Sequence, residues 1–559
     1  MKKLLFTQRR LAHHRSMATV VGVVVLCILI FNAFFSSAQN PLVKQWDYRF
    51  GGTDEESLFS FLQTNDGGYL LAGYSLSGIS GDKTEASWGS TDFWILKTDA
   101  AGSALWDKRY GGTDDERLYA AKQTIDGGYL LAGYSNSGIG GDKTETSRGS
   151  TDYWMVKVDP SGTKQWDKRF GGIDYEFINT VVQTDEGGYL AGGQSASGIS
   201  GDRTQSCWGG SDYWIVKTDA AGIKQWDKRF GGTDDDVLNT ILPAGDGGYF
   251  LCGTSLSGAN GDKAEPSWGM FDYWVVKINS AGTIQWEKRY GGTAWDILSD
   301  AVRTPDGGCL LAGRSTSDTG GDRTQPSWGS FDYWVLKIDS LGNLQWDKRY
   351  GGAGYDYLCS AKLTSDKGFI LTGYSGSGIS GDKTENNLGP NQMWTVKIDS
   401  TGNVQWDKTI LTSLSTDQCL PLQAMDGCYL FAGFTNSGTG GDKTQPNWDG
   451  TLNSKDYWLI KFCDSTLTTN IANTDRDSNR EENDQLLLSP NPCEGRLAIT
   501  SLQKAITKIE IYNTLGEKVL TAAVNREPFI VNCEQLPEGI YFVEATAGEK
   551  VLFGKVVKE

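Results

Sequence analysis

The amino-acid sequence predicts an all-β fold, and three observations predict it. A stretch of 60 residues recurs about seven times, and one tryptophan of each copy stands at a fixed spacing: Trp46, Trp106, Trp166, Trp226, Trp286, Trp346 and Trp406. The chain contains 71 Gly against 13 Pro, with 20 Trp and 23 Tyr, which is typical of tight turns and large packing aromatics. Its short apolar runs alternate with polar residues and show no helical period. A fixed period of this length indicates a repeat architecture.

One repeat is predicted to form four strands. In the second copy we expect them at residues 118–124, 129–135, 152–159 and 165–170. The sequence Asp126-Gly127-Gly128 is a hairpin-turn signal between the first two. Four short strands with turns between them are typical of one blade of a β-propeller. The last strand carries Lys168 and Arg169, and such charges protect an outer edge strand, so we expect the strands to run from the centre outwards.

The number of strands predicts how the ring closes. Six complete four-strand units run from residue 53 to residue 410, but the seventh, 412–463, has three strands. A fourth strand with the right pattern precedes the first unit, at residues 45–50. A blade built from both ends of the repeat region leaves no open edge. The sequence therefore predicts a seven-bladed β-propeller over residues 45–463, closed by its N-terminal strand.

Regions of different composition flank the repeats. Residues 1–17 are basic, 18–35 are almost wholly apolar, and small residues precede position 39, which predicts a signal peptide of residues 1–38. The alternative is an uncleaved membrane anchor. Residues 464–484 are polar and are predicted to be a linker. Residues 485–559 alternate again in short strands and predict a small Ig-like β-sandwich.

Charge and histidine content exclude several functions. The formal net charge is −17, and five of the basic residues lie in the leader, so clustered cations for phosphate contacts are lacking and we expect no nucleic acid partner. The only two histidines, His13 and His14, also lie in the leader. This excludes Ser-His-Asp and Cys-His catalysis and histidine-bearing metal sites in the exported chain. We expect no catalytic residue, no metal site and no cofactor, with calcium as a weakly supported exception.

Nine cysteines follow the leader, and most replace an ordinary residue of the repeat. We interpret those as small buried hydrophobic residues rather than disulfide partners. Cys493 and Cys533 belong to the C-terminal domain and could pair with each other. The nine are Cys207, Cys252, Cys309, Cys359, Cys419, Cys428, Cys463, Cys493 and Cys533.

Some repeated features allow two interpretations. An aspartate in Gly-Asp-Lys/Arg recurs in every copy, and it either makes local turn hydrogen bonds, which we favour, or coordinates calcium. Five copies carry a tryptophan in the long loop, which either packs the blades, again favoured, or offers a stacking platform for sugars. These five are Trp88, Trp208, Trp268, Trp328 and Trp448.

Positions at which the copies disagree are the better candidates for a ligand site, because a single site must break the symmetry. The long loops and the inter-blade links share one face, where function usually lies. In three links an aromatic residue replaces an acid, and an acid follows in six. Aromatic rings beside carboxylates suit a carbohydrate or a cation, although the acids could instead only fix the turn. The candidate ligand-binding residues are Tyr175, Trp295, Tyr355, Glu116, Glu176, Asp296 and Asp356.

Two resemblances support this organisation. The pattern GGYLLAGYS, DYWVVKI, QW and GG resembles the β-propeller repeats of secreted bacterial proteins over residues 45–463. The C-terminal motifs resemble the type A sorting domain of the bacterial type IX secretion system. That resemblance implies the secretion machinery as a partner, a secreted or outer-surface location and attachment to surface lipopolysaccharide. The matching residues are Pro490, Asn491, Pro492, Gly495, Leu515, Gly516, Gly539, Tyr541 and Lys555.

The sequence therefore predicts an exported, non-catalytic propeller that acts as a ligand-binding or adhesion scaffold for a glycan or a protein. One alternative is a carbohydrate-active enzyme, a glycoside hydrolase or lyase, that uses propeller-face carboxylates such as Glu116, Glu176 or Asp296. Another is a purely structural surface module.

Overall fold

The computed structural model describes residues 42–464 and, in the C-terminal region, residues 486–489, 496–501, 506–513, 518–523, 529–532, 536–537, 539–547 and 550–558. The predicted signal peptide, residues 465–484 of the predicted linker and the Cys493–Cys533 pairing lie outside these residues. The chain divides into two compact units, Met1–Thr468 and Thr469–Glu559. No helix in the described ranges is long and apolar enough to cross a membrane.

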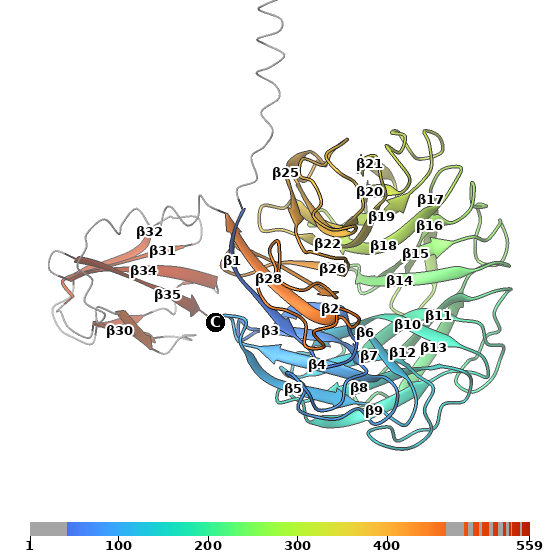
Figure 1. The fold of residues 1–559 in the computed structure, drawn as a ribbon, viewed down its shortest axis with the longest axis horizontal. Helices are drawn as coiled ribbons and strands as arrows, with labels where there is room; N and C mark the ends of the chain where they lie inside the picture. The colour runs from blue at the N-terminus through green and yellow to red at the C-terminus, as the bar shows by residue number, and fades with distance from the viewer. Residues whose placement is uncertain are drawn as a thin grey trace, which may run out of the picture. The chain divides into compact units, whose positions relative to one another are not determined.

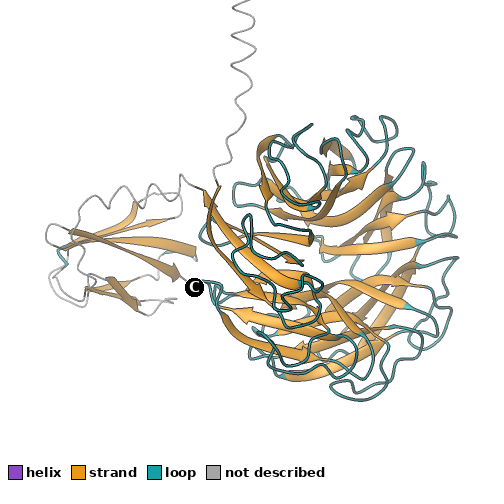
Figure 2. Cartoon of the chain, in the orientation of Figure 1, coloured by secondary structure: helices purple, strands orange, loops and turns teal. Residues whose placement is uncertain are grey.

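The first unit consists of seven four-stranded antiparallel sheets arranged around a centre (Figure 1), and strands and loops make up its described residues (Figure 2). Each sheet is one blade, and in blades 1 to 6 the strands follow one another from the centre outwards, as predicted. Blades 1 to 3 comprise β2 (Glu56–Gln63), β3 (Tyr69–Ser75), β4 (Asp92–Thr98), β5 (Ala104–Tyr110), β6 (Glu116–Gln123), β7 (Tyr129–Ser135), β8 (Asp152–Val158), β9 (Lys164–Phe170), β10 (Glu176–Gln183), β11 (Tyr189–Ser195), β12 (Asp212–Thr218) and β13 (Lys224–Phe230). Blades 4 to 6 comprise β14 (Asp236–Pro243), β15 (Tyr249–Ser255), β16 (Asp272–Ile278), β17 (Ile284–Tyr290), β18 (Asp296–Arg303), β19 (Cys309–Ser315), β20 (Asp332–Ile338), β21 (Leu344–Tyr350), β22 (Asp356–Leu363), β23 (Phe369–Ser375), β24 (Gln392–Ile398) and β25 (Val404–Ile410).

Blade 7 is built from both ends of the repeat region, which confirms the predicted closure. Its inner strands are β26 (Thr416–Gln423), β27 (Tyr429–Thr435) and β28 (Asp456–Asp464), and its outer strand is β1 (Leu42–Phe50). β1 pairs antiparallel with β28, from Leu42 opposite Asp464 to Phe50 opposite Tyr457. The strand begins three residues before the predicted residue 45.

The turn between the first two strands shows why the Asp-Gly-Gly signal recurs. In blade 2 Gly127 has φ of 80°, a left-handed conformation that favours glycine. The Asp126 carboxylate accepts hydrogen bonds from the Thr124 hydroxyl and the Gly128 amide. It also forms an ion pair of 2.8 Å with Lys157, a buried residue of the third strand. Equivalent ion pairs occur in all seven blades: Lys97–Asp66, Lys157–Asp126, Lys217–Glu186, Lys277–Asp246, Lys337–Asp306, Lys397–Asp366 and Lys461–Asp426.

The hydrophobic core lies between blades. One cluster joins Phe93 and Ile95 of blade 1 to Leu131 and Trp154 of blade 2. The rings of Phe93 and Trp154 have centroids 4.8 Å apart, and the buried third-strand Trp pairs with an aromatic ring of the preceding blade in this way in all blades except blade 7. Aromatic pairs of this kind add to the free energy gained by burying their area. Since neighbouring blades share one core, an unclosed ring would expose a complete hydrophobic face.

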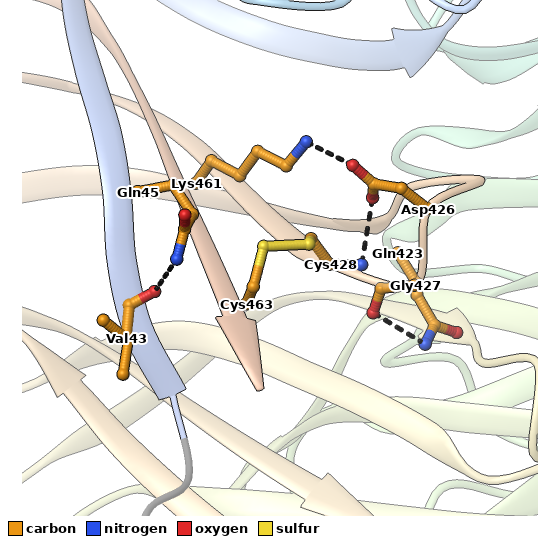
Figure 3. Close-up of a disulfide and its surroundings, with 8 residues drawn as sticks. All are labelled: Val43, Gln45, Gln423, Asp426, Gly427, Cys428, Lys461 and Cys463. Carbon is orange, nitrogen blue, oxygen red and sulfur yellow. Dashed lines mark hydrogen bonds and ion pairs between the residues drawn. A yellow bond between two sulfur atoms is a disulfide. The ribbon is translucent and has the colours of Figure 1, made fainter. Parts of the chain in front are cut away.

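Blade 7 holds a disulfide between Cys428 and Cys463, which corrects our interpretation of these two as unpaired hydrophobic residues (Figure 3). Cys428 replaces the second glycine of the Asp-Gly-Gly turn, and Cys463 replaces the acid or asparagine that opens the next turn in other blades. Blade 7 has no such turn, because its fourth strand comes from the N-terminal end. Cys428 lies one residue before β27 and Cys463 lies in β28, and their Cα atoms are 4.4 Å apart, within the range for a disulfide. Of the other cysteines in the described propeller, all five are free: Cys207, Cys252, Cys309, Cys359 and Cys419.

The second unit contains two antiparallel sheets around one core, consistent with the predicted sandwich. One sheet comprises β29 (Leu486–Ser489), β30 (Arg496–Ser501) and β33 (Phe529–Asn532). The other comprises β32 (Lys518–Ala523), β31 (Lys508–Asn513), β34 (Gly539–Ala547) and β35 (Lys550–Lys558). Buried side chains from both sheets, including Leu497, Val531, Ile511 and Val543, form a single cluster.

Candidate binding face and central channel

The four predicted carboxylates lie at the start of innermost strands and are fully buried. Glu116 accepts hydrogen bonds from the Gly112 amide at 2.6 Å and from the Ser135 hydroxyl at 2.5 Å. Asp296, one methylene shorter, accepts from the Gly292 amide at 2.7 Å and from a different serine, Ser317, at 2.8 Å. Glu176 and Asp356 repeat these two arrangements and are equally buried. The four carboxylates hold the inter-blade turns in place by these hydrogen bonds, and their burial gives a ligand no direct access to them.

A second buried carboxyl faces each of these acids, and the same pair of carboxyls occurs at six of the seven blade junctions. At the junction of blades 3 and 4, Asp212 and Asp236 flank Gly231: a Cβ atom on that glycine would lie 2.3 Å from Asp212 Oδ1 and 2.8 Å from Asp236 Oδ2. Asp212 Oδ1 has no hydrogen-bond partner among the described residues. Burial raises the pKa of Asp212 to about 7, and the neighbouring Asp236 adds to the shift. The pair can therefore hold a proton near neutral pH. Five other junctions repeat it, with Asp92, Asp152, Asp272, Asp332 and Asp456.

These pairs predict that the propeller is more stable at pH 5 than at pH 8. Burial raises the folded-state pKa of Asp92 to about 6 and that of Asp272 to about 7, whereas an unfolded aspartate titrates near 3.8. The folded chain therefore binds protons more tightly than the unfolded chain. The contribution of this proton binding to the free energy of unfolding is lost as the pH rises through 6 to 7. The lysines whose pKa burial lowers to about 8, such as Lys143, stay protonated over most of this range. We expect the Tm at pH 5 to exceed that at pH 8 by roughly 5 °C or more.

The junction of blades 6 and 7 supplies the matched control for this prediction. There Gln392 and Thr416 stand in place of the two acids, and Gln392 Oε1 accepts a hydrogen bond of 2.6 Å from the Thr412 amide. The double variant Asp212→Gln/Asp236→Thr copies this neutral arrangement. It should reduce the change of Tm with pH in calorimetry. A wild-type Tm that rises from pH 5 to pH 8 would contradict the assignment of raised pKa values to these carboxyl pairs.

The repeated Asp of Gly-Asp-Lys/Arg joins neighbouring blades, and our favoured interpretation of a local turn missed this. Asp142 of blade 2 forms an ion pair of 2.8 Å with Arg109 of blade 1, and it accepts a hydrogen bond from the Gly111 amide. The Arg109 guanidinium lies over the ring of Trp88, 4.7 Å from its centroid. The other loop tryptophans stack on an arginine in the same way. Among the described residues no group of three or more acidic, cysteine or histidine side chains is arranged to hold a metal ion.

The three predicted aromatic residues lie on three separate blades. Tyr175 and Trp295 are each 38% exposed, and Tyr355 is half-buried. Tyr175 contacts Phe177, with centroids 5.5 Å apart, and Trp295 contacts Phe271 at the same distance. The Tyr355 ring packs on Gly376 and its hydroxyl bonds Asn391. No observation brings these three together in one site, and their ligand role stays a prediction.

A ring of residues at the centre of the propeller was not predicted from the sequence. Every innermost strand has a register shift against its neighbour, and the residue at this β-bulge is half-buried and lines the central cavity. Bulges re-aim side chains, and here they break the alternation on which the sequence analysis relied. We call these residues the bulge ring: Phe59, Tyr119, Asn179, Asn239, Ser299, Cys359 and Gln418.

Aromatic side chains gather on one side of the bulge ring. Phe59 contacts Tyr119 with ring centroids 4.8 Å apart, and Phe434 of blade 7 contacts Phe59 at 6.1 Å. The Tyr119 ring contacts Tyr134, the Tyr134 ring contacts Phe177, and Phe177 contacts Tyr175. This aromatic belt crosses blades 7, 1, 2 and 3: Phe434, Phe59, Tyr119, Tyr134, Phe177 and Tyr175. Blades 3, 4 and 5 present amide and hydroxyl groups at the bulge, so the cavity of about 300 Å³ has an aromatic side and a polar side.

A second cavity, of about 530 Å³, lies where blade 7 meets blade 1. The four-residue insertion of blade 7 forms one wall. Its Asp449 carboxylate accepts backbone hydrogen bonds from Thr451, Asn453 and Ser454, which fold the insertion around it. Trp448 also lines the cavity, but Arg49 stacks on its ring at 4.1 Å and its indole donates to another blade.

The family model described as a secretion system C-terminal sorting domain matches residues 488–559. The Regulatory protein FlaEY of Caulobacter vibrioides is 24% identical over 356 residues, which span 58% of this chain and 36% of that protein. The WD40 domain of Neurospora crassa Pan2 is 10% identical, with a TM-score of 0.39, over 75% of this chain and 95% of that chain. A protein of unknown function from Dyadobacter fermentans is 10% identical, with a TM-score of 0.37, over 76% and 99%.

The family match covers the C-terminal motifs that the sequence analysis identified. Gly539 and Tyr541 lie in β34 and Lys555 lies in β35. The remaining matching residues lie outside the described ranges: Pro490, Asn491, Pro492, Gly495, Leu515 and Gly516. The sorting domain shows that the chain is exported through the type IX secretion machinery to the cell surface or the medium. The chain is an exported β-propeller protein.

Proposed function

We propose that the propeller is a non-catalytic scaffold that binds a glycan at the centre of the ring, held outside the cell on surface lipopolysaccharide. The aromatic belt carries this proposal. Sugar rings stack on aromatic faces, and Phe59 and Tyr119 present half-buried rings to the cavity. Asn179 and Asn239 offer amide groups on the polar side for sugar hydroxyls.

The carboxylates support binding without catalysis. A glycosidase needs two carboxyl groups about 5 to 10 Å apart in an open site. Glu116, Glu176 and Asp296, named for that alternative, have no exposed surface and hold inter-blade turns. The observations therefore favour a binding scaffold over the carbohydrate-active enzyme.

A glycan-binding assay on the full exported chain tests the proposal. The variants Phe59→Asn and Tyr119→Asn introduce the residue that blades 3 and 4 already carry at this position, so the fold should tolerate them. We expect each to weaken binding of a responding glycan about tenfold, which is the loss of about 1.4 kcal/mol of stacking. The control Trp328→Arg copies Arg148 of blade 2 in a distant loop and should leave the affinity unchanged.

Three outcomes would contradict the proposal. Release of soluble oligosaccharide by the purified chain would show catalysis. Equal affinities for the wild type and for Phe59→Asn would place the site elsewhere. Saturable binding of a protein with no binding across a broad glycan panel would favour the protein-adhesion alternative.

A further inference from the structure

Charged side chains from three of the seven innermost strands line the central cavity, which we also call the channel. Lys122 and Lys362 occupy the same position of the repeat in blades 2 and 6, three residues after the bulge, and both line the cavity. Other blades have leucine or valine there: Leu62, Val182, Leu242, Val302 and Leu422. Asp300 of blade 5 stands where other blades have Ser, Ala, Thr or Leu. These three side chains break the symmetry of the channel.

Asp300 neutralises only one of the two lysines. Its carboxylate lies 3.2 Å from Lys362 Nζ and accepts hydrogen bonds from the Ser360 hydroxyl at 2.7 Å and the Ala361 amide at 3.1 Å. Lys362 also donates to Ser360 at 3.2 Å. Thr240 of blade 4 donates to the other carboxylate oxygen at 3.3 Å. Within this network across blades 4, 5 and 6, the Asp300 carboxylate and the Lys362 ammonium group therefore neutralise each other.

Lys122 remains without a counter-charge. No described residue forms a hydrogen bond or an ion pair with its ammonium group, which lines the central cavity. Lys122 is exposed to the solvent of this cavity. Desolvation by the protein around it, followed by the nearby positive charge of Lys362, lowers the pKa of Lys122, and Asp300 offsets this in part. The cavity lining thus carries two lysines and one aspartate, in a protein whose formal net charge is −17. Among the described residues that line the cavity, Lys122 is the one charged side chain without an ion pair, so the unpaired charge that an anion would meet there is positive.

Neutral polar groups line the same cavity as this cation. Asn239 lines the same cavity, and its side-chain oxygen is buried without a hydrogen-bond partner. Asn179 and Ser299 line it as well. A cavity of about 300 Å³ has room for roughly ten water molecules, which suits one monosaccharide better than a long chain.

We propose that the channel binds a small polyhydroxylated carboxylate, a sugar acid, with the carboxylate at Lys122. The amide and hydroxyl groups of blades 3 to 5 receive its hydroxyl groups. The inference rests on the proposed function in that it uses the same cavity, and it names the chemical class of the sugar. A single charged contact of this kind distinguishes an acidic from a neutral sugar of equal size.

Titration calorimetry of the full exported chain with glucuronate and glucose tests this inference. We expect glucuronate to bind at least tenfold more tightly than glucose, with an affinity that falls as salt is added. Lys122→Leu introduces the residue of blades 1, 4 and 7 and should weaken glucuronate binding at least tenfold. Asp300→Thr introduces the residue of blades 3 and 4, frees Lys362, and should strengthen binding.

The opposite signs of the two variants separate a binding effect from a folding defect, since a damaged fold cannot raise affinity. Arg148→Trp removes one positive charge from an outer loop and restores the tryptophan of five other blades, so it should leave binding unchanged. Equal affinities for the two sugars, or a Lys122→Leu affinity within twofold of the wild type, would overturn the sugar-acid inference while leaving a neutral glycan site in place. Binding of neither sugar, together with no response across the glycan panel, would remove both proposals.

Discussion

Deleting residues 42–50 is expected to cost more than about 5 kcal/mol of unfolding free energy, a large share of the 5–15 kcal/mol typical of proteins. The deletion removes β1, which covers the outer edge of blade 7 along the length of β28. Phe50, only 4% exposed, leaves the core shared by blades 7 and 1. Trp458 loses the Asp47 carboxylate that accepts its indole N–H at 3.0 Å. A buried donor left without a partner costs about 1–3 kcal/mol by itself.

Thermal unfolding followed by near-UV circular dichroism measures this effect. We expect the deletion variant to lose its cooperative transition or to melt more than roughly 15 °C below the wild type. A synthetic peptide of residues 42–50, added in trans, should restore part of the transition because it supplies the missing strand. A deletion variant that melts within a few degrees of the wild type would refute closure by β1.

The disulfide provides a control on the same blade. Cys428 and Cys463 link β27 to β28 and do not cross the boundary between β28 and β1. Replacing both by serine should cost about 2–4 kcal/mol, the usual value for a disulfide, and should leave the transition cooperative. The loss on deleting β1 should exceed this.

The repeat made the fold predictable, because errors in assigning the strands of one copy average out over seven copies. A 60-residue period fixed the four strands of each blade, and the missing fourth strand of the last unit led directly to β1. The disulfide was missed because Cys428 and Cys463 are 35 residues apart, and only the register of β27 against β28 places them opposite each other. Each cysteine alone resembles a replaced repeat residue.

The candidate site was less predictable, because its residues meet only once the ring has closed. Glu116 was placed on an exposed link, but its carboxylate folds back onto the Gly112 amide and the Ser135 hydroxyl and is fully buried. Tyr119 appeared to be one residue of an alternating strand until the bulge turned it to the channel. Lys122 and Asp300 are three blades apart in the ring, so no local pattern indicates that they line the same cavity.

The second large effect is expected at Asp167, on the outer strand of blade 2. Its carboxylate is 4% exposed and accepts hydrogen bonds from the Thr144 amide at 2.9 Å, the Thr144 hydroxyl at 3.0 Å and the Trp154 indole at 3.2 Å. Lys164 forms an ion pair with it at 2.8 Å. Asp167→Ala leaves these donors without an acceptor and should cost about 3 kcal/mol or more in chemical denaturation.

Blade 4 shows how the same contact tolerates a longer acid, and this gives the prediction its sharpest test. There Glu287 replaces the aspartate, and Ala264 replaces the threonine whose hydroxyl would occupy the added space. Glu287 still accepts from the Ala264 amide at 3.0 Å and the Trp274 indole at 2.7 Å. In blade 2, Asp167→Glu should therefore destabilise by overpacking and Thr144→Ala by losing one hydrogen bond, about 1 kcal/mol or more each. The double variant should lie within about 1 kcal/mol of the wild type, because each change relieves the defect of the other, whereas strictly additive losses would show that the two residues act independently.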